Sequence, residues 1–347
     1  MQATGLSLAQ WDLLMRQARK SLLLAQLGEQ LRQAGVIACI PALVQRHMHS
    51  DQLSVAAQNR AVHWEVHCLQ RTLARIGVPL VLLKGAAYVV AEQSMAQGRM
   101  FSDMDILVPQ DRLDDVERVL TMDGWLPTHQ NAYDQRYYRN WMHELPPMRH
   151  AQRGTSLDVH HNIIPLTSRY RLNAALLLAE AQNVNGDEWV KVLSPGDRIL
   201  HSAAHLFLEG EFNRGLRDLV DIALMLREFS DEPRFWNSLL VRARELGLSA
   251  PLYYALTFCR QILDVAVQDA VLSASAVDTG PIYMRRILEK LFLYALMPTH
   301  RSCDTPLTGT CRWLLYVRAH YIKMPMYLLL PHLLRKAWLK RLGDSEK

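Results

Sequence analysis

Two carboxylates, Asp103 and Asp105, lie two residues apart in the segment 102–108 (SDMDILV). The apolar residues around them predict a buried strand, and residues i and i+2 of a strand point to the same face. Like charges on a buried face are costly unless a cation lies between them. The pair therefore predicts a divalent-metal site of the kind that nucleotide transfer requires.

A cationic turn, Lys84-Gly85, precedes this pair in the chain. The apolar run 79–83 predicts a buried strand and residues 86–96 predict a helix, so a strand-to-helix turn is expected at Gly85. Gly85 permits close approach to the backbone, and the amide groups at a helix start favour phosphate. Lys84 would add a positive charge suited to a triphosphate. The alternative is an ordinary turn with a solvated lysine.

Two side chains just before the aspartate pair also suit phosphate. Arg99 can bind two phosphate oxygens at once through its guanidinium group. Ser102 can donate a hydrogen bond to a phosphate oxygen. Lys84, Gly85, Arg99 and Ser102 are therefore the expected nucleotide-binding residues.

A third carboxylate, Asp158, is expected in a strand within residues 153–164. Three carboxylates can hold two Mg²⁺ ions, one on the triphosphate and one that lowers the pKa of an attacking hydroxyl. Asp158 could also act as general base on that hydroxyl. His160 shares its face of the strand; it either orients Asp158 or the acceptor, or is a buried structural histidine. Asp103, Asp105 and Asp158 are thus the expected catalytic and metal-binding residues.

In this order and spacing, residues 82–85, 99–108 and 157–160 resemble the uncharacterised bacterial nucleotidyltransferase-like family of the DNA polymerase beta superfamily. The resemblance covers roughly residues 55 to 230 and implies a minimal core, a short mixed sheet with helices around it. It implies that Asp103 and Asp105 are the metal-binding pair, that Asp158 is the third carboxylate and that Lys84-Gly85 begins the phosphate-binding helix. Members of this family are often associated with polysaccharide or peptide biosynthesis loci.

The chain departs from the wider superfamily at the phosphate turn. Most members carry Gly-Ser there, whereas Ala86 and Ala87 follow Gly85. The serine hydroxyl is missing, and Lys84 or Ser102 is left to replace it. The departure bears on the transferred group more than on the metal site, and the resemblance leaves the acceptor undefined.

The formal net charge of +5 is concentrated at the C-terminal end. Residues 312–347 hold eight of the 39 Lys and Arg residues but two of the 34 Asp and Glu residues, so residues 1–311 are close to neutral. This charge distribution gives little support to a nucleic-acid track across the body, and a small-molecule or protein acceptor is expected instead.

The basic tail mixes aromatic, leucine and cationic residues, as interfacial amphipathic segments do. Pro325 and Pro331 divide it into short pieces. The favoured interpretation is a terminal helix whose leucines pack on the body. Peripheral membrane contact through the tail is the alternative.

Composition agrees with a globular protein of more than one domain, with 50% hydrophobic and 21% charged residues among 347. An odd number of cysteines without a CxxC pair fits a reducing cytoplasm. The N-terminus lacks the pattern of a secretion signal, and no apolar run of about eighteen residues is present. The five cysteines are Cys39, Cys68, Cys259, Cys303 and Cys311.

The elements that must position these residues are mostly helical. Periodicity predicts amphipathic helices within 8–34 and 52–76 and a helix over 111–124. Residues 125–149 predict strands with a loop at Pro146-Pro147 that could border the site. After about residue 165 the pattern predicts helices to the end, with a sharp helix start at Ser194-Pro195.

Two of the C-terminal helices carry polar pairs on one face: His201 with His205, and Asp218 with Asp221. These four residues could form a second metal site or contact the base and the acceptor. A structural hydrogen-bond cluster between packed helices is the favoured interpretation. Arg214 and Arg217 are either phosphate ligands or surface residues.

The sequence as a whole predicts an α+β protein. A small mixed-sheet nucleotidyltransferase core (77–165) follows an N-terminal helical region (1–76) and precedes a C-terminal helical domain with a basic tail (166–347). The expected activity is Mg²⁺-dependent transfer of a nucleoside monophosphate from an NTP such as ATP to a hydroxyl or phosphate acceptor. Two alternatives stay open: a non-catalytic nucleotide-binding or regulatory module, and a membrane-peripheral scaffold of a biosynthetic assembly.

Overall fold

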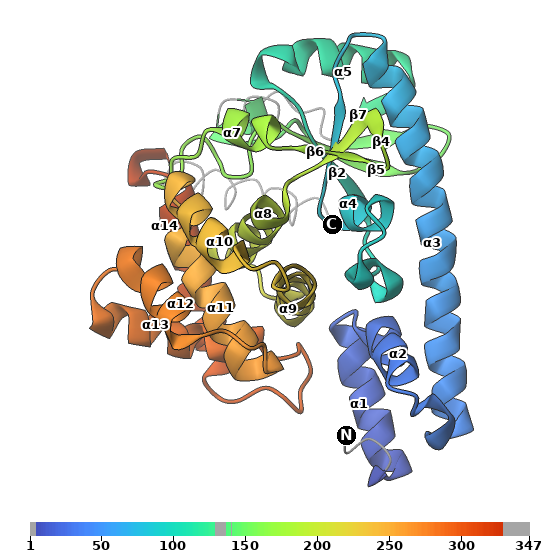
Figure 1. The fold of residues 1–347 in the computed structure, drawn as a ribbon, viewed down its shortest axis with the longest axis vertical. Helices are drawn as coiled ribbons and strands as arrows, with labels where there is room; N and C mark the ends of the chain where they lie inside the picture. Colours follow the sequence, from blue (N-terminus) through green and yellow to red (C-terminus); the bar gives the residue numbers. More distant parts are fainter. Residues whose placement is uncertain (1–4, 129–136, 140, 329–347) are drawn as a thin grey trace, which may run out of the picture.

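The structure, a computed structural model, describes residues 5–128, 137–139 and 141–328. In Figure 1 the N-terminal helices lie at the bottom and right, the sheet near the top, and the C-terminal helices at the left. The α+β class and the order of helices, mixed sheet and helices are confirmed. The division into three domains stays a prediction.

The sheet has the strand order β3-β4-β5-β2-β1-β7-β6. Its central strands are mixed in direction, because β1 is antiparallel to β2 and parallel to β7, whereas β2 is parallel to β5. The predicted strands within 79–83, 102–108 and 153–164 are therefore confirmed as β1, β2 and β5. The strands are β1 (Leu80–Leu83), β2 (Asp103–Leu107), β3 (Trp125–Pro127), β4 (Met148–His150), β5 (Ser156–His160), β6 (Gln182–Val184) and β7 (Asp187–Val192).

The N-terminal region forms α1 (Leu8–Lys20), α2 (Leu24–Gln33), the short helix η2 (Ile37–Cys39) and α3 (Ala42–Ala74). The expected helix over 52–76 is confirmed but begins ten residues earlier, because Pro41 has a φ of −56° that suits helix entry. One face of α3 packs on the sheet with residues such as Val62, Leu69 and Leu73.

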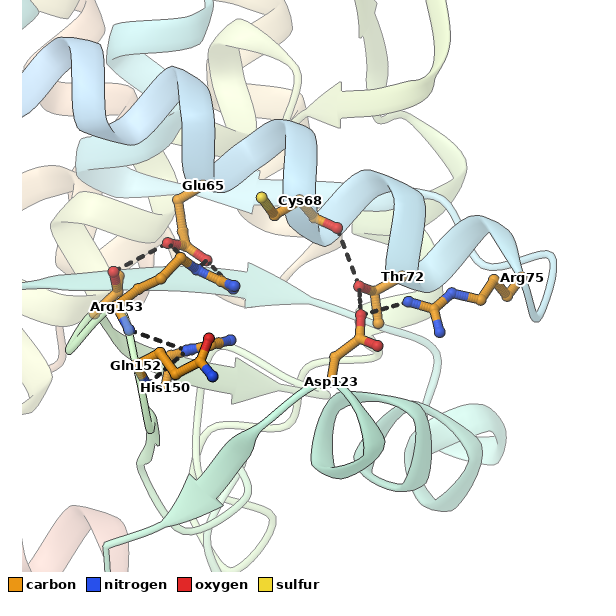
Figure 2. A network of polar contacts seen from close by, with 9 residues as sticks. Glu65, Cys68, Thr72, Arg75, Asp123, His150, Gln152 and Arg153 are labelled. Atoms are coloured by element: carbon orange, nitrogen blue, oxygen red, sulfur yellow. Dashed lines mark hydrogen bonds and ion pairs between the residues drawn. The ribbon is translucent and has the colours of Figure 1, made fainter.

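Polar contacts fix α3 to the sheet near the end of the helix (Figure 2). Arg153, in the turn between β4 and β5, donates to Glu65 from Nη2 at 2.6 Å and from Nε at 2.9 Å. Asp123, after the helix α5 (Leu113–Met122), accepts from Arg75 at 2.5 Å and from Thr72. Because Arg153 lies three residues before the start of β5, these contacts help to fix the strand that carries the third carboxylate.

The predicted bounds of the helix over 86–96 are wrong. The helix is α4 (Lys84–Val90), and the short helix η3 (Ser94–Gly98) follows it. Glu92 has a φ of 52°, and this left-handed conformation interrupts the helix. The helix expected over 111–124 is confirmed as η4 (Gln110–Arg112) and α5.

Strands β3 and β4 confirm the expected strands within 125–149. The intervening residues 129–136 and residue 140 lie outside the described part. Residues 137–139 and 141 are helical, and Glu144 forms an isolated bridge with His160 of β5.

The expectation that the chain is helical after residue 165 is wrong over 182–192. These residues form the hairpin of β6 and β7, and β7 extends the sheet by pairing with β1. The strands are short and mostly polar, so they show no clear period. The dipeptide Asn185-Gly186 is nevertheless typical of a hairpin turn, and its φ values of 50° and 79° are both positive.

The helices expected after residue 192 are confirmed within the described part of the chain. Ser194 accepts a hydrogen bond from the Asp197 amide, and Pro195 begins the helix α8 as predicted. Within the described residues no helix is long and apolar enough to cross a membrane. Residues 329–347, most of the basic tail, lie outside the described part. The helices are α7 (Ala174–Ala179), α8 (Pro195–Leu208), α9 (Gly215–Phe229), α10 (Phe235–Glu245), α11 (Ser249–Leu263), α12 (Asp269–Ser275), η5 (Ala276–Asp278), α13 (Ile282–Leu296) and α14 (Thr308–Lys323).

Candidate active site

Asp105 and Asp158 are neighbours in the sheet, because β2 and β5 are parallel and these two residues are register partners. Asp103 precedes Asp105 by two residues on β2 and lies on the same face. All three carboxylates line one cavity of about 710 Å³. The structure thus brings together the three aspartates singled out from the sequence.

The two adjacent carboxylates have opposite pKa shifts. Burial and the negative charges of Asp105 and Glu144 raise the pKa of Asp158 to about 7. Burial also acts to raise the pKa of Asp105, but the charge of Lys84 and a hydrogen bond from His160 outweigh burial and hold that pKa below its usual range. At neutral pH one carboxyl group is ionised, while its neighbour is about half protonated.

The strand-to-helix turn forms at the predicted place, since β1 ends at Leu83 and α4 begins at Lys84. Lys84 has a φ of 44°, which is a strained conformation for a residue with a Cβ. Gly85 is buried, and a Cβ there would lie 2.6 Å from Arg99 Nη1 and 2.7 Å from the Phe101 ring. The missing side chain at position 85 therefore lets Arg99 and Phe101 pack against the turn.

Lys84 contributes a positive charge to the cavity wall. Burial acts to lower the pKa of its amine, but the charges of Asp105, Glu209 and Asp218 outweigh burial and raise the pKa above its ordinary value. No carboxylate of the described residues forms an ion pair with it within 4.0 Å. The Lys84 charge is therefore compensated at a distance and available to an anionic ligand.

Arg99 and Ser102 line the same cavity but already have carboxylate partners. Arg99 Nε donates to Asp221 Oδ2 at 2.5 Å in a buried ion pair, and its Nη1 lies beside Gly85. Ser102 Oγ donates to Asp103 Oδ1 at 2.9 Å. Both side chains are held in place at the cavity wall, with Arg99 next to the turn.

His160 lies between two carboxylates. Its Nε2 is 3.0 Å from Asp105 Oδ1, and its Nδ1 is 3.3 Å from Glu144 Oε2. Burial acts to lower the pKa of His160, but the hydrogen bond with Asp105 and the charge of Glu144 raise it. Of the two interpretations of His160, this geometry agrees with orienting a carboxylate of the cavity, and that carboxylate is Asp105 rather than Asp158.

The polar pairs of α8 and α9 also reach this cavity. His205 Nε2 is 3.0 Å from Glu209 Oε2, and its Nδ1 is 4.0 Å from Asp218 Oδ2. Within the described residues, three side chains have ligand atoms close enough together, within 4.8 Å of one another, to share a metal ion, and none of the four residues in these pairs is among them. The side chains of His201, His205, Asp218 and Asp221 form one wall of the cavity, and the hydrogen-bond cluster expected between the two helices stays a prediction.

Three further cations line the cavity. Arg217 donates to Asp218 from Nε at 3.0 Å and from Nη2 at 2.7 Å. Arg214 and Lys323 form no ion pair with any carboxylate of the described residues. With Lys84, they are positive groups that a ligand can reach without breaking an ion pair.

Sequence reasoning missed His143, Glu144, Glu209 and Lys323, which also line the cavity. Burial raises the pKa of Glu144, with the charge of Glu209 adding to the rise. The stretch 141–148 is apolar except for His143 and Glu144, and that contrast was an available signal. Lys323 comes from α14, so no local pattern connects it to the sheet.

The donor set fits a divalent cation. Mg²⁺ is usually bound by one or two carboxylates together with phosphate and water oxygens. Asp105 and Asp158 are adjacent, and the negative charge crowded around Asp158 raises its pKa. A bound cation would relieve that repulsion, and the cations of the opposite wall suit a polyphosphate.

A family model described as an uncharacterised nucleotidyltransferase matches residues 7–264, more than half of the chain. The match contains the three aspartates, the turn at Lys84 and the walls formed by α8 and α9, whereas Lys323 lies beyond it. No curated protein and no solved structure matches the chain.

Proposed function

Because the chain belongs to this family of uncharacterised nucleotidyltransferases, we propose that it transfers a nucleoside monophosphate from an NTP to a hydroxyl or phosphate acceptor and releases pyrophosphate. The observation that carries the proposal is the register of Asp105 with Asp158 at a cavity that also contains the Lys84-Gly85 turn. Carboxylates for a metal and cations for a triphosphate thus occur in one cavity of suitable size for a nucleotide.

Asp103, Asp105 and Asp158 would hold Mg²⁺, and two ions are possible with three carboxylates. When bound, Mg²⁺ supplies neutralisation of the phosphate charge. Asp105 is the strongest candidate ligand, because its carboxyl group stays ionised over the whole neutral range. His160 fixes the orientation of Asp105 by hydrogen bonding to one of its two oxygens, and the other oxygen stays available to a cation.

The triphosphate would lie against the turn. Lys84, Arg214 and Lys323 carry charges without ion-pair partners in the described part, so binding a phosphate requires no contact to be broken. Arg99 is fixed by Asp221 with its Nη1 beside Gly85, which places guanidinium charge at the turn. Lys84 and Ser102 are the candidates to replace the missing serine of the wider superfamily.

Asp158 is the proposed general base. Its pKa is about 7 in the metal-free protein. A bound cation would lower that pKa, so the carboxylate would be ionised and able to accept a proton from an acceptor hydroxyl at neutral pH. The acceptor oxygen forms a bond to the α-phosphorus, the bond from that phosphorus to the bridging oxygen of the β-phosphate breaks, and pyrophosphate leaves. Asp158 takes the proton of the acceptor hydroxyl. Positioning and charge neutralisation supply most of the lowering of the barrier.

A small molecule or a group presented by a protein is the proposed acceptor. The cavity of about 710 Å³ is in the range of small-ligand sites, and residues 1–311 are close to neutral, which disfavours a nucleic acid. A role in polysaccharide or peptide biosynthesis agrees with such acceptors. A cytoplasmic location agrees with NTP substrates and with five cysteines that are all free thiols.

The competing candidate is a nucleotide-binding module without catalysis. A thermal-shift screen of four NTPs with Mg²⁺ or Mn²⁺, followed by a pyrophosphate-release assay with candidate acceptors, separates the two. Metal-dependent stabilisation with pyrophosphate release supports transfer. Stabilisation without release supports a binding module, and neither effect would contradict both.

A peripheral membrane contact is proposed in addition, because aromatic residues of α14 are exposed next to the basic tail. Trp313 and Tyr316 on this helix and Tyr327 just after it are 62%, 43% and 73% exposed. Aromatic side chains next to cationic residues are typical of interfacial segments.

A further inference from the structure

Three side chains that line the cavity converge, and the proposed transfer uses one of them, His160, only to orient Asp105. One ligand atom each from His143, Glu144 and His160 lies within 4.8 Å of the other two. The backbone sets this arrangement, because Glu144 bridges His160 of β5 and the His143 carbonyl accepts from the His161 amide at 2.9 Å. Two neighbouring residues of one segment are thus fixed against a sheet strand.

Two nitrogens of this group, Nδ1 of His143 and Nδ1 of His160, are buried and make no hydrogen bond, in residues that are 6% and 5% exposed. Among the described residues, His160 Nδ1 has only the Glu144 carboxylate at ion-pair distance. Burying a polar atom without a partner costs about 1 to 3 kcal/mol. The rings stack with centroids 5.3 Å apart, and His160 Nδ1 is 3.3 Å from Glu144 Oε2. A cation between these atoms would satisfy the two nitrogens and the carboxylate together.

The contact of His160 Nε2 with Asp105 determines which ring nitrogen carries the proton. Nε2 is 3.0 Å from Asp105 Oδ1, and a proton on Nε2 donates to that carboxylate. The lone pair of the neutral ring is then on Nδ1. A histidine that gives its other N–H to a carboxylate is the usual arrangement at metal sites, because the carboxylate sets the tautomer and the ring orientation.

We propose that His143, Glu144 and His160 bind one Zn²⁺, at a site separate from the Mg²⁺ proposed for the aspartates. Two imidazoles and one carboxylate suit Zn²⁺ rather than Mg²⁺, which prefers oxygen ligands. All three residues line the cavity, so the fourth position is open to water or to a hydroxyl, phosphate or carboxylate group of the acceptor. The site needs no nucleotide, and its existence is independent of catalysis.

The test begins with full-length protein stripped of metal by a chelator and titrated with Zn²⁺ in competition with a chromophoric chelator, without nucleotide. We expect one equivalent to bind tightly. Substitution by Co²⁺ gives visible absorption whose intensity reports a four- or five-coordinate site. Absence of uptake by the stripped wild type, as expected if His160 is an imidazolium held between Asp105 and Glu144, would overturn the proposal without bearing on nucleotide transfer.

Three variants locate the site: His143→Asn, Glu144→Gln and His160→Gln. Each should weaken Zn²⁺ binding by at least about 100-fold and abolish the Co²⁺ band. His205→Gln is the matched control, because His205 is a histidine of the same cavity outside the group, and it should bind Zn²⁺ as the wild type does. Equal affinity in all four variants would place the metal elsewhere and contradict the assignment; the wild-type titration and spectrum stay decisive if a variant does not fold.

Discussion

Asp105 and Asp158 are register partners across the parallel strands β2 and β5, and their pKa values are shifted in opposite directions. Lys84 and His160 stabilise the ionised form of Asp105, whereas burial and the nearby negative charges stabilise the protonated form of Asp158. Pairs of carboxyl groups whose pKa values are pushed apart are typical of sites that move protons.

The first prediction concerns Asp158 and pH. A free aspartate has a pKa of about 4, and the folded protein raises that of Asp158 to about 7. Stability is therefore lost as pH rises from about 4 to about 7, because the unfolded chain releases the proton first. In metal-free protein, Asp158→Asn should raise the free energy of unfolding by about 2 to 4 kcal/mol at pH 8 and by about 1 kcal/mol at pH 4.5. Urea unfolding at both pH values measures the difference.

The control for this prediction is Asp114→Asn, at an exposed position of α5. It should leave stability within about 0.5 kcal/mol of the wild type at both pH values. A gain from Asp158→Asn that does not change with pH would contradict the raised pKa.

The second prediction concerns the space at Gly85. In Gly85→Ala the new Cβ would lie within 3 Å of Arg99 and Phe101, both packed at the turn. We expect a loss of about 1 to 3 kcal/mol of stability and weaker NTP binding. Gly309→Ala in α14 is the matched control, because nothing lies within 4 Å of its Cβ position. It should stabilise by up to about 1 kcal/mol. Similar thermal shifts for the two variants would show that the turn has room for a side chain.

The third prediction concerns the ion pair of Arg99 with Asp221, whose side chains are 8% and 6% exposed. Removing either partner leaves a buried charge, so Arg99→Met and Asp221→Leu should each cost about 3 to 5 kcal/mol. The double variant should cost much less than the two single variants added together. Chemical denaturation of the four proteins measures the coupling. The same cycle on the exposed pair Arg260 and Asp269 should give about 1 kcal/mol or less; equal coupling in both cycles would contradict the role of burial.

The fourth prediction concerns the basic tail. Deleting residues 329–347 removes five of the eight Lys and Arg residues of 312–347, and the deleted protein should no longer sediment with anionic liposomes. Binding by the full chain should weaken with salt, because screening reduces attraction to the charged surface. Neutral liposomes are the control. Equal sedimentation of both proteins would rule out contact through the tail.

The elements with simple patterns could be predicted from the sequence. The apolar run of β1 was visible because this strand is buried on both faces. In β2 and β5, aspartates on the cavity face alternate with buried apolar residues on the other face. Lys84-Gly85 marked the turn. These local signals placed the principal polar groups on one side of the sheet.

What the sequence left out depends on contacts between distant segments. The hairpin β6–β7 is polar because it lies at the sheet edge, and its Asn185-Gly186 turn was the one local sign. Glu144 acts through a bridge to His160, and Arg99 through an ion pair with Asp221, both across long separations in the chain. Such pairings change a residue's pKa and availability without changing the pattern around it.

The central claim, transfer with carboxylate-held metal, is tested most directly by Asp105→Asn. The variant should bind and turn over NTP with Mg²⁺ at least about 100-fold less well than the wild type. Unchanged circular dichroism and a cooperative unfolding transition should show an intact fold, with a lower unfolding temperature because the interactions of the Asp105 charge with Lys84 and His160 are lost. Asp114→Asn is the control. Loss of pyrophosphate release in Asp105→Asn alone is the predicted result. Pyrophosphate release by Asp105→Asn at the rate of the wild type would contradict the account.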